Sequence, residues 1–71
     1  MPDKRFTFDP YSEGSCIYET DEDGTIVELV AWARSTLVAN VAYEELCRLN
    51  PEKSYLQKRR SHVENERIVK R

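Results

Sequence analysis

The sequence is poor in the side chains that carry redox chemistry, metal binding and acid–base catalysis. Its 71 residues include two cysteines, Cys16 and Cys47, and one histidine, His62. Two cysteines are too few for the disulfide framework of a small secreted protein, and these three side chains lack the paired spacing of a zinc site. A domain of this size also has little room for a water-excluding catalytic pocket. We therefore expect no enzymatic activity, no metal and no cofactor.

The sequence also lacks a long hydrophobic run. The richest stretch, Ile26–Ala33, has eight residues and is interrupted by Glu28, whereas a membrane-spanning helix needs about 20 apolar residues. The amino terminus, Met-Pro-Asp-Lys-Arg, has no apolar segment of the kind that a signal peptide requires. We expect a protein of the cytoplasm with no membrane partner.

Basic residues are absent from Asp9 to Ala33, a segment that holds seven acidic ones. From Leu56 to Arg71 the balance reverses, with six basic residues against two acidic ones. The formal net charge of −2 therefore conceals a separation of charge along the chain. Such a separation concerns association and the choice of partner, and it does not indicate a reaction.

The acidic segment around Gly24 has some resemblance to a calcium-binding loop. Glu19, Asp21 and Asp23 would occupy positions 1, 3 and 5 of an EF-hand loop, with Gly24 at position 6. The twelfth position, which needs a bidentate glutamate, is Val30. A tight turn explains the glycine equally well, so we interpret this segment as a turn without metal.

Turn signals divide the chain into an arm, a domain and a tail. Residues 1–14 contain two prolines and predict an arm, in which Phe6 and Phe8 could form a short edge strand. Residues 15–66 form the single domain, and residues 67–71 are expected to fray. Within the domain, Asp23-Gly24 lies between two segments rich in strand-forming residues and predicts a β-hairpin.

The length of the hairpin loop leaves the strand register open. A two-residue loop pairs Tyr18 with Leu29, and a four-residue loop pairs Tyr18 with Val27. In both registers one face is the same, and we expect it to face the core: Cys16, Tyr18, Val27, Leu29 and Ala31. The other face would leave an apolar patch of Ile17, Val30 and Trp32 that needs a cover.

A helix is predicted to begin after Ser35 as its N-cap and to end near Leu49, because Asn50-Pro51 stops it. A helical period places its core stripe at Val38, Ala42, Leu46 and Leu49, with Asn40, Glu44 and Arg48 pointing away. An alternative extends the helix back to Thr25, but Thr25–Val30 alternates and is rich in β-branched residues, which favours a strand.

Ser54–Arg59 alternates and predicts a third strand, with Leu56 or Tyr55 facing inward. The following residues fit either a continuation of this strand, long and exposed, or a polar helix. We favour the strand. The fold class is then α+β, a small antiparallel sheet in the order β-β-α-β with one helix packed on one face.

Several local sequences resemble short bacterial proteins in which a strand enters an alanine-rich helix and a basic strand follows a proline. They are Trp32–Ala39, Ala42-Tyr43, Pro51 and Leu56-Gln57. The resemblance implies the same order of elements, and it carries no activity, ligand or site residue to this chain.

The leading functional hypothesis is a small protein-interaction module. One helix covers only one face of a sheet, so Trp32, Val30 and Ile17 would form an exposed apolar interface with Trp32 as its anchor. The partner would be a second copy in a homodimer, or another protein. The alternative is a nucleic-acid-binding module using Tyr55, Lys58, Arg59 and Arg60, in which Tyr55 stacks on a base.

Overall fold

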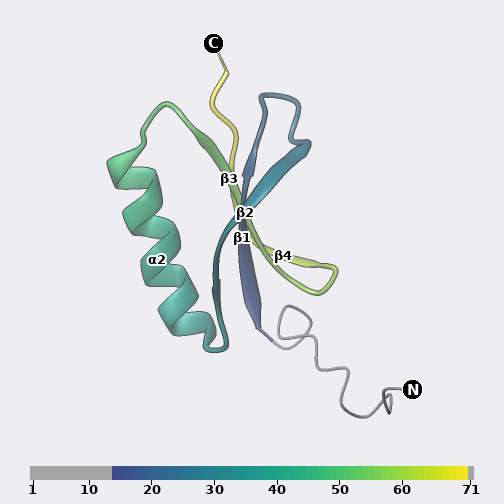
Figure 1. The fold of residues 1–71 in the computed structure, drawn as a ribbon, viewed down its shortest axis with the longest axis vertical. Helices are drawn as coiled ribbons and strands as arrows, with labels where there is room; N and C mark the ends of the chain where they lie inside the picture. The colour runs from purple at the N-terminus through teal and green to yellow at the C-terminus, as the bar shows by residue number, and fades with distance from the viewer. Residues whose placement is uncertain (1–13, 71) are drawn as a thin grey trace, which may run out of the picture.

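The computed structural model describes residues 14–70, which form a four-stranded antiparallel sheet with a helix along one face (Figure 1). The elements are β1 (Ser15–Thr20), β2 (Ile26–Ala33), α2 (Thr36–Leu49), β3 (Ser54–Arg59) and β4 (His62–Arg67). The strand order across the sheet is β2-β1-β3-β4. The α+β prediction is confirmed, and the chain adds a fourth strand to give the order β-β-α-β-β. The predicted arm lies outside the described residues, apart from Gly14.

The turn between β1 and β2 is organised by Asp21. Its Oδ1 accepts hydrogen bonds from the backbone N–H groups of Asp23 and Thr25, both at 2.9 Å. Gly24 has a φ of 87°, a conformation that costs glycine nothing. Tyr18 pairs with Leu29, which is one of the two predicted registers. The acidic segment is thus a hairpin turn closed by its own carboxylate.

The helix covers the face of the sheet opposite to the one predicted. Ile17 lies opposite Gln57 and Ala31, and it forms the buried cluster with Tyr43 of the helix and Tyr55 of β3. Cys16 is buried as predicted, but it and Tyr18 belong to the face away from the helix, and Val27 and Leu29 are exposed. Of the predicted core face, only Ala31 packs beneath the helix.

A bulge in β2 explains the irregular position of Ala31. Between Ile17 and Tyr18 the partner changes from Ala31 to Leu29, so Val30 is an extra residue. Val30 and Ala31 both pack against the core, as two successive residues do at a bulge. Strict alternation therefore assigns this part of β2 incorrectly.

Both ends of α2 follow the local sequence signals. Ser35 Oγ accepts from the Val38 N–H at 3.4 Å, which caps the first turn. At the other end the Asn50 N–H donates to the Leu46 carbonyl at 2.9 Å, and Pro51 cannot continue the helix. The predicted helix bounds are confirmed.

The face of α2 that contacts the sheet differs from the predicted stripe. Ala39 and Tyr43 are its buried residues, and Ala42 and Leu46 pack at the edge of the core. Val38 and Leu49, which complete the predicted stripe, are exposed. Asn40 was expected to point away, but it faces the sheet and accepts a hydrogen bond from Gln57. The predicted core stripe was therefore only half right.

The end of the chain forms a hairpin in place of one long strand or a polar helix. Arg60 and Ser61 form the two-residue turn between β3 and β4. Arg60 has a φ of 56°, and the two-residue turns favoured in β-hairpins require a positive φ at their first position. Beyond β4, the Val69 N–H donates to Ser54 Oγ at 2.7 Å. Contacts therefore extend past residue 66, the expected end of the domain.

The connection through α2 crosses over β1, which with β3 forms the buried centre of the sheet. β2 and β3 both pair antiparallel with β1, so they run parallel to each other and the helix crosses over β1.

Within residues 14–70, α2 is neither long nor apolar enough to cross a membrane. The core beneath the helix is small, which makes the polar contacts around it important.

Candidate functional site

The predicted apolar interface of Ile17, Val30 and Trp32 does not form an exposed patch. Ile17 is fully buried, and Val30 and Trp32 are half-buried. Trp32 lies against Gly14, where an added Cβ would come within 2.7 Å of the indole Nε1. The helix covers Ile17 and the bulge turns Val30 toward the core, so the three residues do not share one surface.

The helix presents polar side chains to the sheet, and they form a network centred on Gln57. The Gln57 Nε2 donates to Asn40 Oδ1 at 2.9 Å and to Glu64 Oε1 at 3.1 Å. Its Oε1 accepts from Asn65 Nδ2 at 2.9 Å. Because Gln57 is fully buried, these bonds replace the water that its amide loses on folding.

The network extends toward the beginning of the helix through Glu64 and Arg59. Ser15 Oγ donates to Glu64 Oε1 at 2.6 Å, and Arg59 Nε lies 3.8 Å from Glu64 Oε2. The Arg59 Nη2 donates to Thr36 Oγ1 at 2.7 Å and to the Arg34 carbonyl at 3.1 Å. Arg59 therefore holds the start of α2 against the sheet.

The chemistry of this network is structural. In this network the Ser15 hydroxyl contacts the Glu64 carboxylate. A carboxylate in such a pair can activate a hydroxyl as a nucleophile. Ser15 is fully buried, so a substrate could not reach its oxygen. The donors and acceptors satisfy one another, and the arrangement fixes the helix on the sheet.

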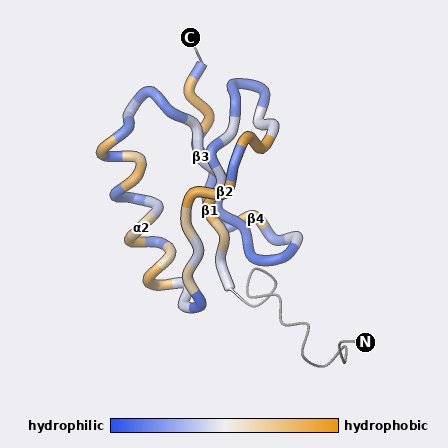
Figure 2. The backbone as a smooth tube through the Cα atoms, in the orientation of Figure 1, coloured by the Kyte–Doolittle hydropathy of each residue, from blue (hydrophilic) through white to orange (hydrophobic). Residues whose placement is uncertain are grey.

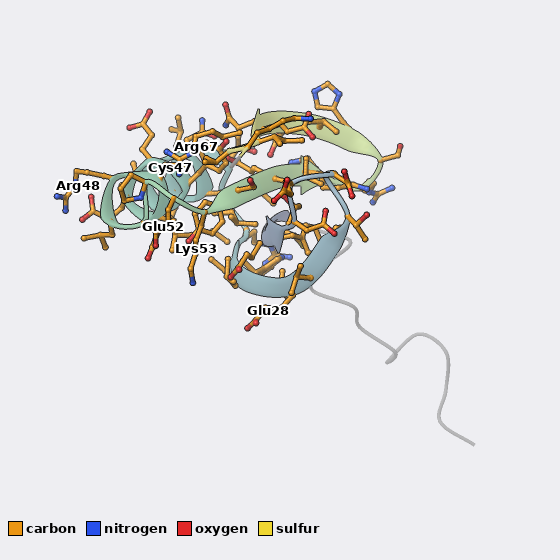
Figure 3. The ribbon with its side chains drawn as sticks, turned by 90° about the horizontal axis from the view of Figure 1, so that it is seen from above. Glu28, Cys47, Arg48, Glu52, Lys53 and Arg67 are labelled. Carbon is orange, nitrogen blue, oxygen red and sulfur yellow. The ribbon has the colours of Figure 1, made fainter. Side chains whose placement is uncertain are left out.

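A second polar contact fixes the other end of the helix. Arg67 of β4 donates from Nη2 to the carbonyls of Asn50 at 2.8 Å and Lys53 at 2.7 Å, and from Nη1 to that of Cys47 at 3.3 Å. Figure 3 shows Arg67 beside Cys47, with Arg48 pointing away from the sheet. A cation at a helix C-terminus also interacts favourably with the helix dipole.

Burial raises the pKa values of the two core tyrosines. The pKa of Tyr43 rises to about 12, first because burial disfavours the phenolate and next because of the neighbouring Cys47. The pKa of Tyr55 is also raised, chiefly by burial. Both phenols stay neutral at physiological pH, as core residues should.

Apolar residues lie on the outer face of α2, the face directed away from the sheet. We call Leu37, Val38, Val41 and Leu49 the outer apolar stripe; their exposed fractions are 77%, 59%, 68% and 60%. Glu45 and Arg48 lie on the same face and form an ion pair that lowers the pKa of Glu45. This stripe is the largest exposed apolar feature on the helix, and a polar outer face would be usual.

Of the residues predicted to bind nucleic acid, the aromatic one is separated from the basic ones in the structure. Tyr55 is buried in the core, so its ring cannot stack on a base, and that assignment was wrong. Lys58 and Arg59 are half-buried, and Arg60 is exposed at the hairpin turn. Arg59 reaches the carbonyl of Arg34, which adds an arginine that the sequence reasoning did not include.

A shallow hollow of about 360 Å³ lies at the opposite end of the sheet. Its lining is Glu19, Thr20, Asp21, Glu22, Glu52, Lys53, Ser54 and Val69. The Lys53 Nζ lies 3.6 Å from Glu19 Oε1 and neutralises part of the charge. Within residues 14–70, no group of three or more acidic, cysteine or histidine side chains is arranged to hold a metal ion.

The sequence reasoning missed the polar network. Its members come from four elements, and no spacing along the chain links Ser15, Asn40 and Gln57. The available signal was the presence of Asn40 in the middle of a helix, where an amide side chain is unfavourable unless it has a partner.

The chain was also compared with known proteins. Comparisons with protein-family models, with curated proteins and with solved structures found no match to this chain.

Proposed function

We propose that this chain is a small non-enzymatic protein-interaction module that binds through the outer apolar stripe of α2. The observation that carries the proposal is the exposure of four large aliphatic side chains on the outer face of the helix, while the amide of Asn40 faces the sheet beside Tyr43 and Leu46. Covering apolar surface gains about 25 cal/mol per Å², so a partner that covers the stripe is favoured. The module is expected to bind itself or another protein.

The polar network supports this interpretation. The buried bonds of Gln57 and the contacts of Arg67 fix the rotation of α2 about its axis. The stripe is therefore held outward by specific contacts, and the helix cannot roll to bury Val38 or Leu49 without breaking them. A rigid exposed helix face is a common binding element, since little conformational entropy is lost on binding.

Sedimentation velocity over the micromolar range tests the proposal. The wild-type chain should show a sedimentation coefficient that rises with concentration, and Val41→Glu should abolish the rise because a charge would be buried at the contact. Val27→Glu is the matched control, since Val27 is 58% exposed but lies on β2. A wild-type chain equally sensitive to both substitutions would refute binding through the stripe, and one that stays monomeric throughout would refute self-association through it.

Both cysteines of the described chain are free thiols. Free thiols persist in a reducing compartment, so the cytoplasm is our proposed location.

Nucleic-acid binding is a second candidate, favoured by the proximity of Arg34 to Arg59 near the exposed Arg60. Fluorescence anisotropy with a labelled single-stranded oligonucleotide at low ionic strength tests it. Binding should weaken with salt and with Arg60→Glu, because contacts to phosphate release counterions. Absence of binding at low ionic strength would eliminate this candidate.

A further inference from the structure

We infer that a second copy of this chain covers the outer apolar stripe, with the two α2 helices packed antiparallel about a two-fold axis. The inference rests on the proposed function and names its partner and geometry. The result is a layered dimer in which two sheets enclose two helices. The evidence is the distribution of charge along the helix axis.

One end of the molecule is acidic. The turn between β1 and β2 and the loop between α2 and β3 lie together at the top of Figure 1, and the contact between Lys53 and Glu19 joins them. The acidic side chains there are Glu19, Asp21, Glu22, Asp23 and Glu52, and the counter-charges are Lys53 and Arg67. The C-terminus of α2 lies at this end, because the loop to β3 begins at Asn50, the C-cap of the helix.

The opposite end is basic. The connection from β2 to α2 and the turn between β3 and β4 lie in the lower half of Figure 1, and Arg59 joins them through the Arg34 carbonyl. The charged side chains there are Arg34, Lys58, Arg59 and Arg60, with Glu64 as the counter-charge. The N-terminus of α2 is at this end, capped by Ser35. Figure 2 shows that both ends are hydrophilic.

The helix dipole reinforces this separation of charge. A helix N-terminus carries a partial positive charge and its C-terminus a partial negative one. In this chain the positive pole lies at the basic end and the negative pole at the acidic end, so the two dipoles add. The separation seen along the sequence is thus a separation along the helix axis.

Charge complementarity selects the orientation of the second copy. Antiparallel helices place the acidic end of each copy beside the basic end of the other, and a two-fold axis makes both contacts identical. Parallel helices would place like charges together at both ends. The antiparallel pair also brings Leu37 of one copy beside Leu49 of the other.

The dimensions of the helix set the strength of the contact. Fourteen residues at about 1.5 Å each make a helix of about 21 Å. One pair of such helices buries less than the roughly 1,200 Å² of a standard stable interface, which places the dimer among weak, reversible associations. Dimer formation should therefore depend on concentration.

Disulfide trapping tests the orientation. In a Cys47→Ala background, Leu37→Cys and Leu49→Cys are prepared as separate full-length variants, and one carries a mass tag. Cys16 is buried and stays. Mild oxidation of the mixture should give the mixed disulfide at least several-fold faster than either variant alone gives its own, because residue 37 of one copy lies beside residue 49 of the other.

The alternatives give different results. Faster disulfides of Leu37→Cys with itself and Leu49→Cys with itself would establish parallel helices and overturn this inference while the interaction function stands. Association of the wild type without any trapping would place the contact elsewhere and overturn it as well. A wild type that stays monomeric in sedimentation would overturn the self-paired dimer, and the proposed function would then require another protein as partner.

Discussion

Gln57 shows how one buried amide can determine the orientation of a helix. Its side chain is fully buried and bonds to Asn40, Glu64 and Asn65, so it links β3 to both α2 and β4. An apolar residue at this position would fill the space, but it would remove one of the two donors to Asn40 Oδ1, the other being Asn65 Nδ2 at 3.3 Å. Buried polar groups are costly when unpaired, and the rotation of the helix therefore depends on this residue.

Gln57→Ala should destabilise the domain by about 2–4 kcal/mol, because it creates a cavity and removes partners from Asn40 and Asn65. Urea unfolding followed by the fluorescence of Trp32 measures the change. Glu44→Ala, an exposed substitution on the helix, is the control and should cost less than about 0.5 kcal/mol. Equal effects of the two substitutions would show that the network contributes little to stability.

Tyr43 makes the stability sensitive to alkaline pH. Its pKa rises from 10.0 to about 12 on burial, so the folded state holds the proton more tightly than the unfolded state. The resulting stabilisation is complete below pH 10.0 and is lost as the pH rises toward 12. Tyr55, also with a raised pKa, contributes in the same direction.

Thermal unfolding at neutral pH and above pH 10.0 checks this linkage. The wild type should lose stability over the alkaline interval, and Tyr43→Phe should lose less because it has no phenol to ionise. Tyr43→Phe keeps the ring, so its packing in the core is preserved. An unchanged alkaline loss in this variant would contradict the role of Tyr43.

Among the secondary-structure elements, α2 shows which features local sequence can determine. Its ends follow from Ser35 and Asn50-Pro51, whose effects act within one turn, and both were predicted from the sequence. Its rotation depends on residues far along the chain, namely Gln57 and Arg67. A hydrophobic stripe was therefore assigned to the core although half of it faces solvent.

The strands illustrate the same limit. The hairpin of β1 and β2 was predicted from Asp23-Gly24, but Arg60-Ser61 carries no glycine or asparagine, so the turn before β4 was missed. The bulge at Val30 also has no local signal, and it changes which residues face the helix. The interface was predicted on the sheet because one helix covers only one face, but Ile17 of that patch is buried beneath the helix.

Arg67 should stabilise the last turn of α2, because it donates to the carbonyls of Cys47, Asn50 and Lys53. Arg67→Leu should cost about 1.5–3 kcal/mol, the range for hydrogen bonds to a charged group. Amide hydrogen exchange should become faster in the last turn of α2 before it does so in the first. Lys70→Leu, an exposed change nearby, is the control, and a uniform increase along the helix would contradict local capping.

Within residues 14–70, acidic and basic side chains are separated along the axis of the helix. Within a dimer of antiparallel helices, the acidic end of each copy lies toward the basic end of the other, across the width of the two helices. Their attraction is screened over roughly 10 Å at 0.1 M salt, so it contributes mainly at low ionic strength. Orientation should therefore be most strongly selected in dilute buffer.

Charge reversal should show this complementarity. Arg34→Glu with Arg60→Glu makes both ends acidic and should weaken self-association several-fold, because each contact then joins like charges. Glu22→Lys with Asp23→Lys makes the other end less acidic, so mixing the two double variants should restore association as a mixed dimer. Sedimentation equilibrium of each variant and of the mixture measures the effect, and raising the salt concentration should reduce it. A mixture that associates no better than the arginine variant alone would contradict the role of these charges in the dimer, while the disulfide trapping decides the orientation of the helices.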